Sequence, residues 1–505
     1  MKTNKAGWQL LITGDSELLN TLKSIRERYH QPAMACALVN SNKIIAKACA
    51  GTVVYGQNKA VKIDSRFHIG STTKTMTALL IQMLVNEEKI RYDTPLEKAL
   101  PDIPMREEYR QVSLAALLLN QAGILPLQRS DTEAPAVWQK LWHDIPAAFS
   151  KPEEQRHEVA KFALNLAPIN KPGTKAVYSN TGWSIAGHII DAVADRPYEA
   201  FLQERIFRPL GMKKAKIGGW PASSAEPDQP RGHYPAAGGL PQPQELENNA
   251  YIFPNWMNPA GGVHCSITDF ALYVQENLAG LQGHGRLLDK KGYDNIHTLH
   301  LSEKISDMYA YNPQMSGQKG TVNMGYGWAI STFQGSSLST ASGSGGTFYA
   351  TIAVYPALDI GFAGFTSCGD GSAALEEAIL QMTGLDDSPA QVTSATGTAK
   401  NSNKLLEGKA QAWIELMVAE KFDLAAGFLD KTFTAHLPVA AIRDSWASLI
   451  SQVGNFQSIR SISSVNKDNL DYVSVTCVFT RAVIIIRVIY DSAEKIVGLE
   501  IKPSV

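Results

Sequence analysis

The 505 residues of this chain are too many for one ordinary hydrophobic core, so the length predicts two or three domains. Hydrophobic residues make up 44% of the chain and charged residues 19%, a balance typical of folded proteins and not of disordered ones. The formal net charge of −1 argues against proteins that bind nucleic acids or anionic membranes, because both classes favour clustered basic surface.

The five cysteines are scattered, odd in number and without Cys-x-x-Cys spacing, which favours small buried residues over a disulfide framework. No apolar run reaches membrane-spanning length, so we expect no membrane span. The basic start of the chain is followed by an apolar run too short for a signal peptide. We therefore expect either a cytoplasmic protein or one whose export signal lies upstream and is missing from this chain.

The first predicted elements are a helix and a hairpin. Asp15 can cap a helix over residues 15–29, whose apolar side chains recur at helical spacing. Residues 35–39 and 44–50 read as two strands joined by a turn at Ser41 and Asn42.

Residues 67–84 combine a short apolar run, a glycine, and then Ser71 at the start of an apolar helix. Lys74 follows three residues later, so both side chains lie on one helical face. A serine hydroxyl needs a nearby base to act as a nucleophile, and an amine can serve if burial lowers its pKa. The start of a helix also offers backbone N–H groups to an oxyanion.

Ser-x-x-Lys alone does not decide the function, because the same spacing recurs at Ser316, Ser464 and Ser492. A helix-capping role for Ser71 and a solvated Lys74 remain open on this stretch alone.

Residues 86–309 read mainly as helix and loop, inserted into a sheet that the chain leaves near residue 85 and re-enters near residue 326. The Gly- and Pro-rich stretch 216–258 is too long for an ordinary connection, so we expect a surface excursion near the site. Strands are predicted at 329–333, 347–355 and 360–366, followed by a helix over 373–382.

Residues 384–403 have the composition of a linker, which divides the chain into residues 1–383 and a small domain over 404–505. The small domain reads as helices followed by strands at 459–465, 472–480, 483–490 and 496–501. The predicted fold class is α/β (α+β): an antiparallel sheet flanked by helices with an inserted helical subdomain, plus a small C-terminal α+β domain.

Several stretches in a fixed order carry a family resemblance: Phe67–Lys74, Leu117–Gly123, Tyr178–Gly182, Phe207–Met212, Pro259–Thr268 and Tyr326–Trp328. Over residues 15–383 the chain resembles the serine β-lactamase and penicillin-binding-protein superfamily, in its class C β-lactamase and esterase branch. The resemblance implies a serine hydrolase that uses neither metal nor cofactor and acts on a small ester, amide or peptide.

The resemblance also implies roles for single residues. Ser71 would be acylated by the substrate carbonyl, while Lys74 and Tyr178 would take and return its proton. Asn180 would bind Lys74 and the substrate. Gly343 would let the substrate approach, and the N–H of Ser344 would complete the oxyanion hole with that of Ser71.

The third family motif, Lys-Thr-Gly or His-x-Gly, aligns with Ala341-Ser-Gly-Ser344, so its basic residue is missing. A partner for a substrate carboxylate is thereby lost, which favours the hydrolysis of neutral acyl groups. Two alternatives stay open. One is a β-lactamase proper or D-amino-acid peptidase whose carboxylate partner comes from elsewhere, such as Arg231 or His233. The other is a non-catalytic, ligand-binding relative.

The C-terminal domain resembles the nuclear-transport-factor-like accessory domains of some bacterial serine hydrolases, through Gly454-Asn-Phe456 and the strands that follow. We assign it no chemistry. Its default hypothesis is binding or homodimerisation, because a curved sheet with helices at its mouth is a usual place for a pocket.

Overall fold

We describe a computed structural model of the chain. The structure describes residues 10–126, 135–235, 240–246, 253–312, 320–333, 335–384, 404–430, 433–434, 438–467 and 470–503. They divide into two compact units. The first unit holds most of the chain up to Gly384. The second unit holds the C-terminal part together with residues 27–30, Pro235 and Leu240. The predicted linker lies outside the described residues, apart from Gly384.

The first unit is built on an eight-stranded sheet in which every pair of neighbouring strands is antiparallel. The strand order is β2-β1-β13-β12-β11-β10-β9-β8. The strands are β1 (Ala33–Val39), β2 (Ile44–Gly51), β8 (Leu301–Lys304), β9 (Thr321–Met324), β10 (Ala329–Phe333), β11 (Ser336–Ser344), β12 (Tyr349–Tyr355) and β13 (Ile360–Thr366). The first and last strands along the chain, β1 and β13, are neighbours, so the insertion opens and closes within one sheet.

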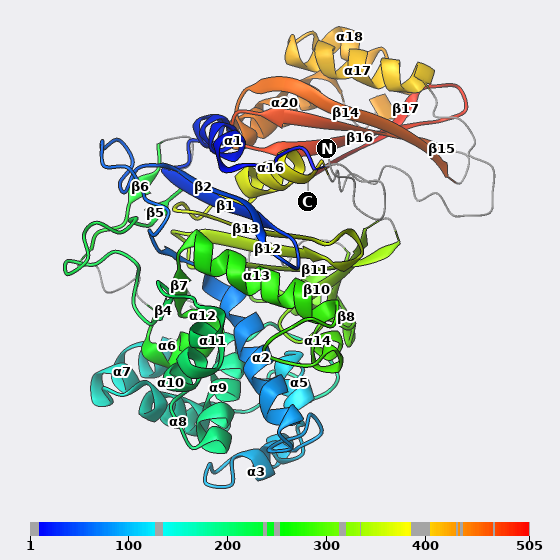
Figure 1. Cartoon of the computed structure of the whole chain (residues 1–505). Coiled ribbons are helices and arrows are strands. Elements are labelled where there is room, and N and C mark those ends of the chain that lie inside the picture. Colours follow the sequence, from blue (N-terminus) through cyan, green and yellow to red (C-terminus); the bar gives the residue numbers. More distant parts are fainter. Residues whose placement is uncertain are drawn as a thin grey trace. The chain divides into compact units, whose positions relative to one another are not determined.

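Helices cover both faces of this sheet (Figure 1). Helices α1 (Asp15–Arg28) and α16 (Ser372–Thr383) lie on one side, and α2 (Thr73–Asn86) and α13 (Ile267–Leu281) on the other. All seven residues of β1 and of β13 are buried, as expected for strands covered on both faces. Helix α2 runs from the sheet into the helical insertion and is buried over twelve consecutive residues, from Thr73 to Leu84.

The insertion holds helices of 3 to 15 residues and small strands, one of which pairs with β3 ahead of the insertion. Its helices are α3 (Leu96–Ala99), α4 (Glu107–Arg110), α5 (Leu114–Leu118), α6 (Pro135–Gln139), α7 (Ile145–Ala148), α8 (Pro152–Ala163), α9 (Asn180–Ala194), α10 (Tyr198–Leu202), α11 (Arg208–Leu210), α12 (Asn258–Gly261), α14 (Lys290–Ile296) and α15 (Ile305–Met308). Strands β3 (Phe67–His68), β4 (Lys216–Ile217) and β7 (Val263–Cys265) form a three-stranded sheet, and β5 (His233–Tyr234) pairs with β6 (Gln242–Pro243).

The predicted fold class and the N-terminal helix and hairpin are confirmed. The re-entry point was predicted too late, because β8 already joins the main sheet at Leu301. The sequence pattern also failed to predict β11 as a strand. Its residues are mostly small and polar, and their burial does not alternate, so the period-2 signal is absent.

The described residues of the second unit form a four-stranded antiparallel sheet, in the order β14-β15-β16-β17, and include the helices α17, α18 and α20. The strands are β14 (Phe456–Lys467), β15 (Leu470–Phe479), β16 (Val483–Tyr490) and β17 (Ile496–Pro503), and the helices are α17 (Lys404–Val418), α18 (Phe422–Ala426) and α20 (Val439–Val453). Helices and sheet share one apolar core that contains Trp413, Trp446 and Phe479. The predicted small α+β domain is therefore confirmed as a fold.

No helix among the described residues is long and apolar enough to cross a membrane. All five cysteines are free thiols.

Candidate active site

Ser71 lies on a tight turn between a short strand and a long buried helix. Strand β3 ends at His68, Gly70 takes a left-handed φ of 51°, and the 3₁₀ turn Gly70–Thr72 leads directly into α2. The imidazole Nδ1 of His68 accepts a hydrogen bond from the N–H of Gly70 at 3.1 Å. Glycine is needed at position 70 because a Cβ there would stand 2.6 Å from the backbone nitrogen of Ser344.

Lys74 lies one turn further along α2 and is 4% exposed. Its Nζ lies 3.1 Å from the Oγ of Ser71, and it donates to the Oδ1 of Asn180 at 2.7 Å and to the main-chain oxygen of Ala260 at 2.6 Å. Burial lowers the pKa of Lys74 well below its ordinary value, because removing the ammonium from water disfavours the charged form. The same nitrogen stands 4.8 Å from the centre of the Tyr178 ring.

Tyr178 and Asn180 come from a distant segment that enters helix α9. The Oη of Tyr178 donates to the Oγ of Ser71 at 2.7 Å. Desolvation by burial raises the pKa of the Tyr178 phenol above its ordinary value, with the nearby Ser71 opposing that effect. Ser179 caps α9 by accepting from the N–H of Gly182 at 3.1 Å, which fixes how the chain enters the helix. The structure thus brings Lys74, Tyr178 and Asn180, which come from two distant segments of the chain, around the hydroxyl of Ser71.

Strand β11 runs against the Ser71 turn. A Cβ at position 343 would stand 2.2 Å from the oxygen of Ile69 and 2.5 Å from the nitrogen of Ser71, so only glycine fits there. The backbone nitrogens of Ser71 and Ser344 therefore both lie where the turn and the end of β11 meet. The side chain of Ser344 is engaged elsewhere, donating to the oxygen of Phe348 at 2.8 Å and accepting from the N–H of Gly346 at 3.0 Å.

The short helix α12 brings the carbonyl of Ala260 to Lys74, and a buried ion-pair cluster holds this helix. Asn258 at its start donates to Glu199 at 2.8 Å. Glu199 in turn pairs with the fully buried guanidinium of Arg156 at 2.7 Å, and Asp191 pairs with the same guanidinium at 2.8 Å. Burial alone would lower the pKa of Arg156, but the two carboxylates outweigh it and raise that pKa.

The histidines near the motifs have structural partners. His264 is 2% exposed, accepts from the Nε of Arg66 at 3.2 Å and contacts the oxygen of Gly218 at 3.1 Å, and burial lowers its pKa to about 4. In His233 both ring nitrogens are used, by the N–H of Tyr55 and the oxygen of Ser367. Its ring therefore has no nitrogen left to receive a substrate carboxylate.

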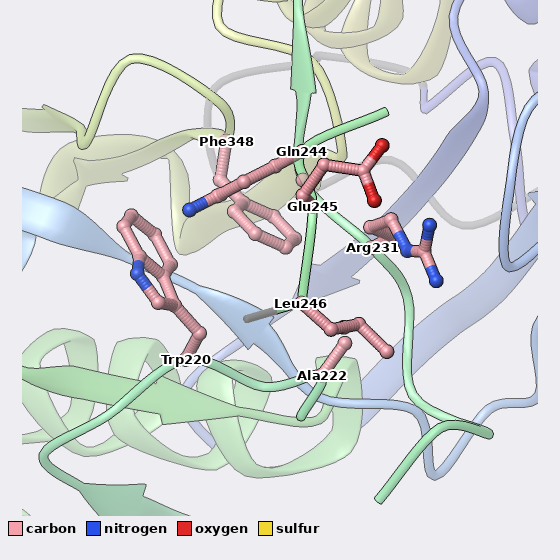
Figure 2. A pocket seen from close by; sticks show the side chains of 8 residues that line it. Trp220, Ala222, Arg231, Gln244, Glu245, Leu246 and Phe348 are labelled. Carbon is pink, nitrogen blue, oxygen red and sulfur yellow. The ribbon is translucent and has the colours of Figure 1, made fainter. Parts of the chain in front are cut away.

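Ala341 occupies the position of the basic residue in the third motif, and Arg231 is a candidate to replace that residue. Ala341 is half-buried on β11, two residues before Gly343. Arg231 is half-buried and borders a pocket with Trp220 and Phe348 (Figure 2).

Among the described residues there is no group of three or more His, Cys, Asp or Glu that could hold a metal ion.

Comparison with known proteins identifies the family of the first unit. Residues 18–382 match the Beta-lactamase family, and this match covers well over half of the chain. The chain belongs to the Beta-lactamase family. Residues 410–499 match a second family described as "Protein of unknown function (DUF3887)".

Relatives within the family are distant. Penicillin-binding protein 4 of Amycolatopsis lactamdurans is 24% identical over 260 residues, which are 50% of this chain and 61% of that protein. A beta-lactamase of Escherichia coli K12 is 24% identical over 261 residues, 52% of this chain and 60% of its own. The chain thus spans about three fifths of the length of these relatives.

A solved structure agrees with the fold over nearly the whole chain. It is the octameric penicillin-binding protein homologue from Pyrococcus abyssi, with a TM-score of 0.57 and 18% sequence identity. The match covers 97% of this chain and 98% of that one, so this likeness of fold extends over both units.

Sequence reasoning missed the carbonyl of Ala260 and the cluster behind it. A main-chain oxygen carries no residue-type signal, so only the position of α12 reveals it. Arg156, Asp191 and Glu199 lie on three different helices and read as ordinary surface charges in the sequence.

Proposed function

We propose that this protein is a serine hydrolase that cleaves ester or amide bonds through an acyl-enzyme on Ser71. One observation carries the proposal: a single hydroxyl lies within hydrogen-bond distance of both a buried amine and a half-buried phenol. A nucleophile, a base and an orienting group in mutual reach are what acyl transfer requires. A helix-capping serine and a solvated lysine would need neither the phenol nor the burial of Lys74.

The hydrogen bonds around Lys74 can accommodate a neutral amine. An uncharged amine has two N–H donors, and Asn180 and Ala260 supply two acceptors for them. The remaining lone pair then faces the hydroxyl of Ser71. Burial lowers the pKa of Lys74, so the neutral form, which can act as the general base, is reached at a lower pH than for an exposed lysine.

The reaction then follows in two steps. The Oγ of Ser71 attacks the substrate carbonyl while its proton passes to Lys74, and the oxyanion is bound by the N–H groups of Ser71 and Ser344. Collapse of this intermediate breaks the bond to the leaving group, which takes a proton from Tyr178; Lys74 returns its proton to the phenol. Water attacks the acyl-enzyme by the same route and releases the acid, which restores Ser71.

A neutral acyl group is the favoured substrate class, because Ala341 stands where the family motif has a basic residue. A β-lactamase proper or a D-amino-acid peptidase would need another partner for the substrate carboxylate. His233 is committed to two main-chain partners, which leaves Arg231 as the candidate of the two.

Covalent labelling and ester turnover test the hydrolase against the non-catalytic alternative. The protein is incubated with a fluorophosphonate and with a chromogenic short-chain ester, beside Ser71→Ala. We expect a mass gain of one phosphonyl group and turnover above background, both absent in the variant. No mass gain, and equal turnover by both proteins, would remove the enzyme and leave a ligand-binding relative.

Peptides ending in D-alanine test for a carboxylate pocket. The rates for free and amidated C-termini are compared on the same peptide. A hydrolase without a partner for the terminal carboxylate predicts equal rates, whereas a peptidase that binds this carboxylate would cleave the free form faster.

We also propose self-association through the second unit. Strand β17 is the edge strand of its sheet, bridged by Leu429 at Ile496, and its Ile501 has 52% of its surface exposed. The part of a strand edge that is left unpaired favours pairing with another copy. The octameric state of the Pyrococcus abyssi homologue supports the idea. Sedimentation velocity of the full chain tests it, with Ile501→Glu expected to shift the protein toward monomer.

A further inference from the structure

The turn that follows helix α5 holds the segment that carries Tyr178. Asn120, in this turn, accepts two hydrogen bonds from that segment. Its main-chain oxygen accepts from the N–H of Val177 at 2.9 Å, and its side-chain Oδ1 accepts from the N–H of Ser179 at 3.2 Å. Asn120 is 5% exposed, so both bonds are shielded from water. One buried residue therefore binds the main chain on both sides of Tyr178.

The neighbouring N–H groups of the same segment also have acceptors. The N–H of Tyr178 itself donates to the main-chain oxygen of Met308 at 2.7 Å, and that of Ala176 donates to the Oε2 of Glu303 at 3.0 Å. Four consecutive N–H groups of the segment are thus bound by other parts of the chain. The ring of Tyr309 lies against the phenol ring, with the two centroids 5.6 Å apart. These contacts together limit where the Tyr178 hydroxyl can lie.

The need to end a helix does not by itself explain an asparagine at position 120. The residue has a left-handed φ of 60°, its N–H donates to the oxygen of Leu117, and the N–H of Gln121 donates to the oxygen of Ala116. This is the Schellman arrangement, whose left-handed position is most often glycine. The side-chain nitrogen of Asn120 is also buried without an acceptor among the described residues, a cost that glycine would not have. What asparagine adds at this position is the bond from Ser179.

We propose that Asn120 is a positioning residue for Tyr178, and that its Oδ1 keeps the phenol where it can donate to the leaving group. The inference rests on the proposed hydrolase function. In that mechanism the phenolic proton passes to the departing atom as its bond to the carbonyl carbon breaks, and Lys74 returns to the phenol the proton that it took from Ser71. A displaced phenol slows this step and leaves the attack by Ser71 in place.

The test compares two esters of one acid that differ in their need for a proton. Ethyl butyrate releases ethanol, whose oxygen must be protonated as it leaves, whereas p-nitrophenyl butyrate releases a stable anion. Asn120→Gly keeps the left-handed turn and the main-chain oxygen and removes Oδ1. We expect kcat/KM to fall about 10- to 100-fold for the ethyl ester and less than about threefold for the p-nitrophenyl ester, as for a catalytic group misplaced by about 1 Å. Equal losses for both esters, or no loss for either, would overturn the proposal.

Ser113→Ala is the matched control for a general weakening of α5. Ser113 caps the start of this helix by accepting from the N–H of Ala116 at 3.2 Å, so the variant destabilises the helix without removing a bond to the Tyr178 segment. We expect both esters to keep kcat/KM within about twofold, as for a change away from the reacting groups. A loss confined to the ethyl ester in Ser113→Ala would count against a specific role for Oδ1.

A double-mutant cycle shows whether the effect passes through the phenol. In a Tyr178→Phe background, Asn120→Gly should change kcat/KM for the ethyl ester by less than about twofold, because the group that it positions is gone. A further large loss in that background would overturn the proposal. Asn120 would then act through the fold as a whole, or through Asn180, which follows Ser179 and accepts from Lys74.

A spectroscopic measurement separates this inference from the hydrolase itself. The protein is prepared with ¹³C at the phenol carbon of its tyrosines, and the Tyr178 signal is assigned by its loss in Tyr178→Phe. This signal should shift in Asn120→Gly and stay in place in Ser113→Ala. A shift without any ester turnover would support the positioning role and reject the hydrolase. Ester turnover by the parent together with an unshifted signal in Asn120→Gly would support the hydrolase and reject the positioning role.

Discussion

Gly343→Ala tests the contact between β11 and the Ser71 turn. The added methyl would stand 2.2 Å from the oxygen of Ile69 and 2.5 Å from the nitrogen of Ser71, and both are main-chain atoms that cannot rotate away. To restore an ordinary contact the strand must move by about 1 Å, a displacement that can cost about 100-fold in rate when it separates catalytic groups. We therefore expect kcat/KM to fall about 100-fold.

The expected loss of stability is modest by comparison. Inserting a methyl group into a packed site costs about 1–3 kcal/mol, part of which the strand relieves by moving. The assay is ester turnover with the pH and temperature held well inside the folded range, with unfolding measured by circular dichroism.

Ser342→Ala is the matched control on the same strand. Its side chain is exposed and shares one hydrogen bond of 2.9 Å with Thr351, so its removal should change stability by about 0.5 kcal/mol or less and leave the rate intact. If Gly343→Ala kept kcat/KM within threefold of the parent while Ser342→Ala did the same, the reacting carbonyl would not lie between β11 and the turn.

Three further predictions concern the base, the support behind it and the second unit. The rate of Ser71 acylation should rise with pH and level off well below pH 10.5, because burial lowers the pKa of Lys74 and the deprotonated amine is the reactive form; a limb centred at or above 10.5 in kcat/KM would contradict a buried base. Asn258→Ala should cost about 1.5–3 kcal/mol of stability through the lost bond to Glu199. By loosening the carbonyl of Ala260 it should also move that limb to lower pH, since an acceptor favours the ammonium; an unchanged limb would mean a purely structural role. Ile501→Glu should leave ester turnover unchanged while it reduces the sedimentation coefficient, and an unchanged coefficient would argue against pairing through β17.

The sequence was most informative where chemistry is local. Ser71 and Lys74 stand three residues apart on one helix, so their proximity follows from helical geometry alone. Tyr178 is more than a hundred residues away, and only the ordered set of family motifs predicted that it would meet them. Single spacing rules carry no such long-range information.

Two parts of the site leave no usable pattern in the sequence. Strand β11 reads as a polar, Gly- and Ser-rich loop, because its glycine is selected by a close approach to Ser71 and not by strand propensity. The contact of the Ala260 carbonyl with Lys74 follows from where α12 lies in the fold, which no residue type in the sequence reveals. Helix α20 does have a pattern in the sequence, because its buried residues Ile442, Trp446, Leu449 and Val453 recur at helical spacing.

The most direct test of the account is to locate the acyl group during turnover. The protein is mixed with a slowly hydrolysed ester, quenched in acid within the first turnover, digested and analysed by mass spectrometry. We predict one acyl group on the peptide that contains Ser71, with Lys74→Ala giving far less of it at the same time point. Turnover without an acylated peptide, or an acyl group found on another residue, would contradict the proposed mechanism.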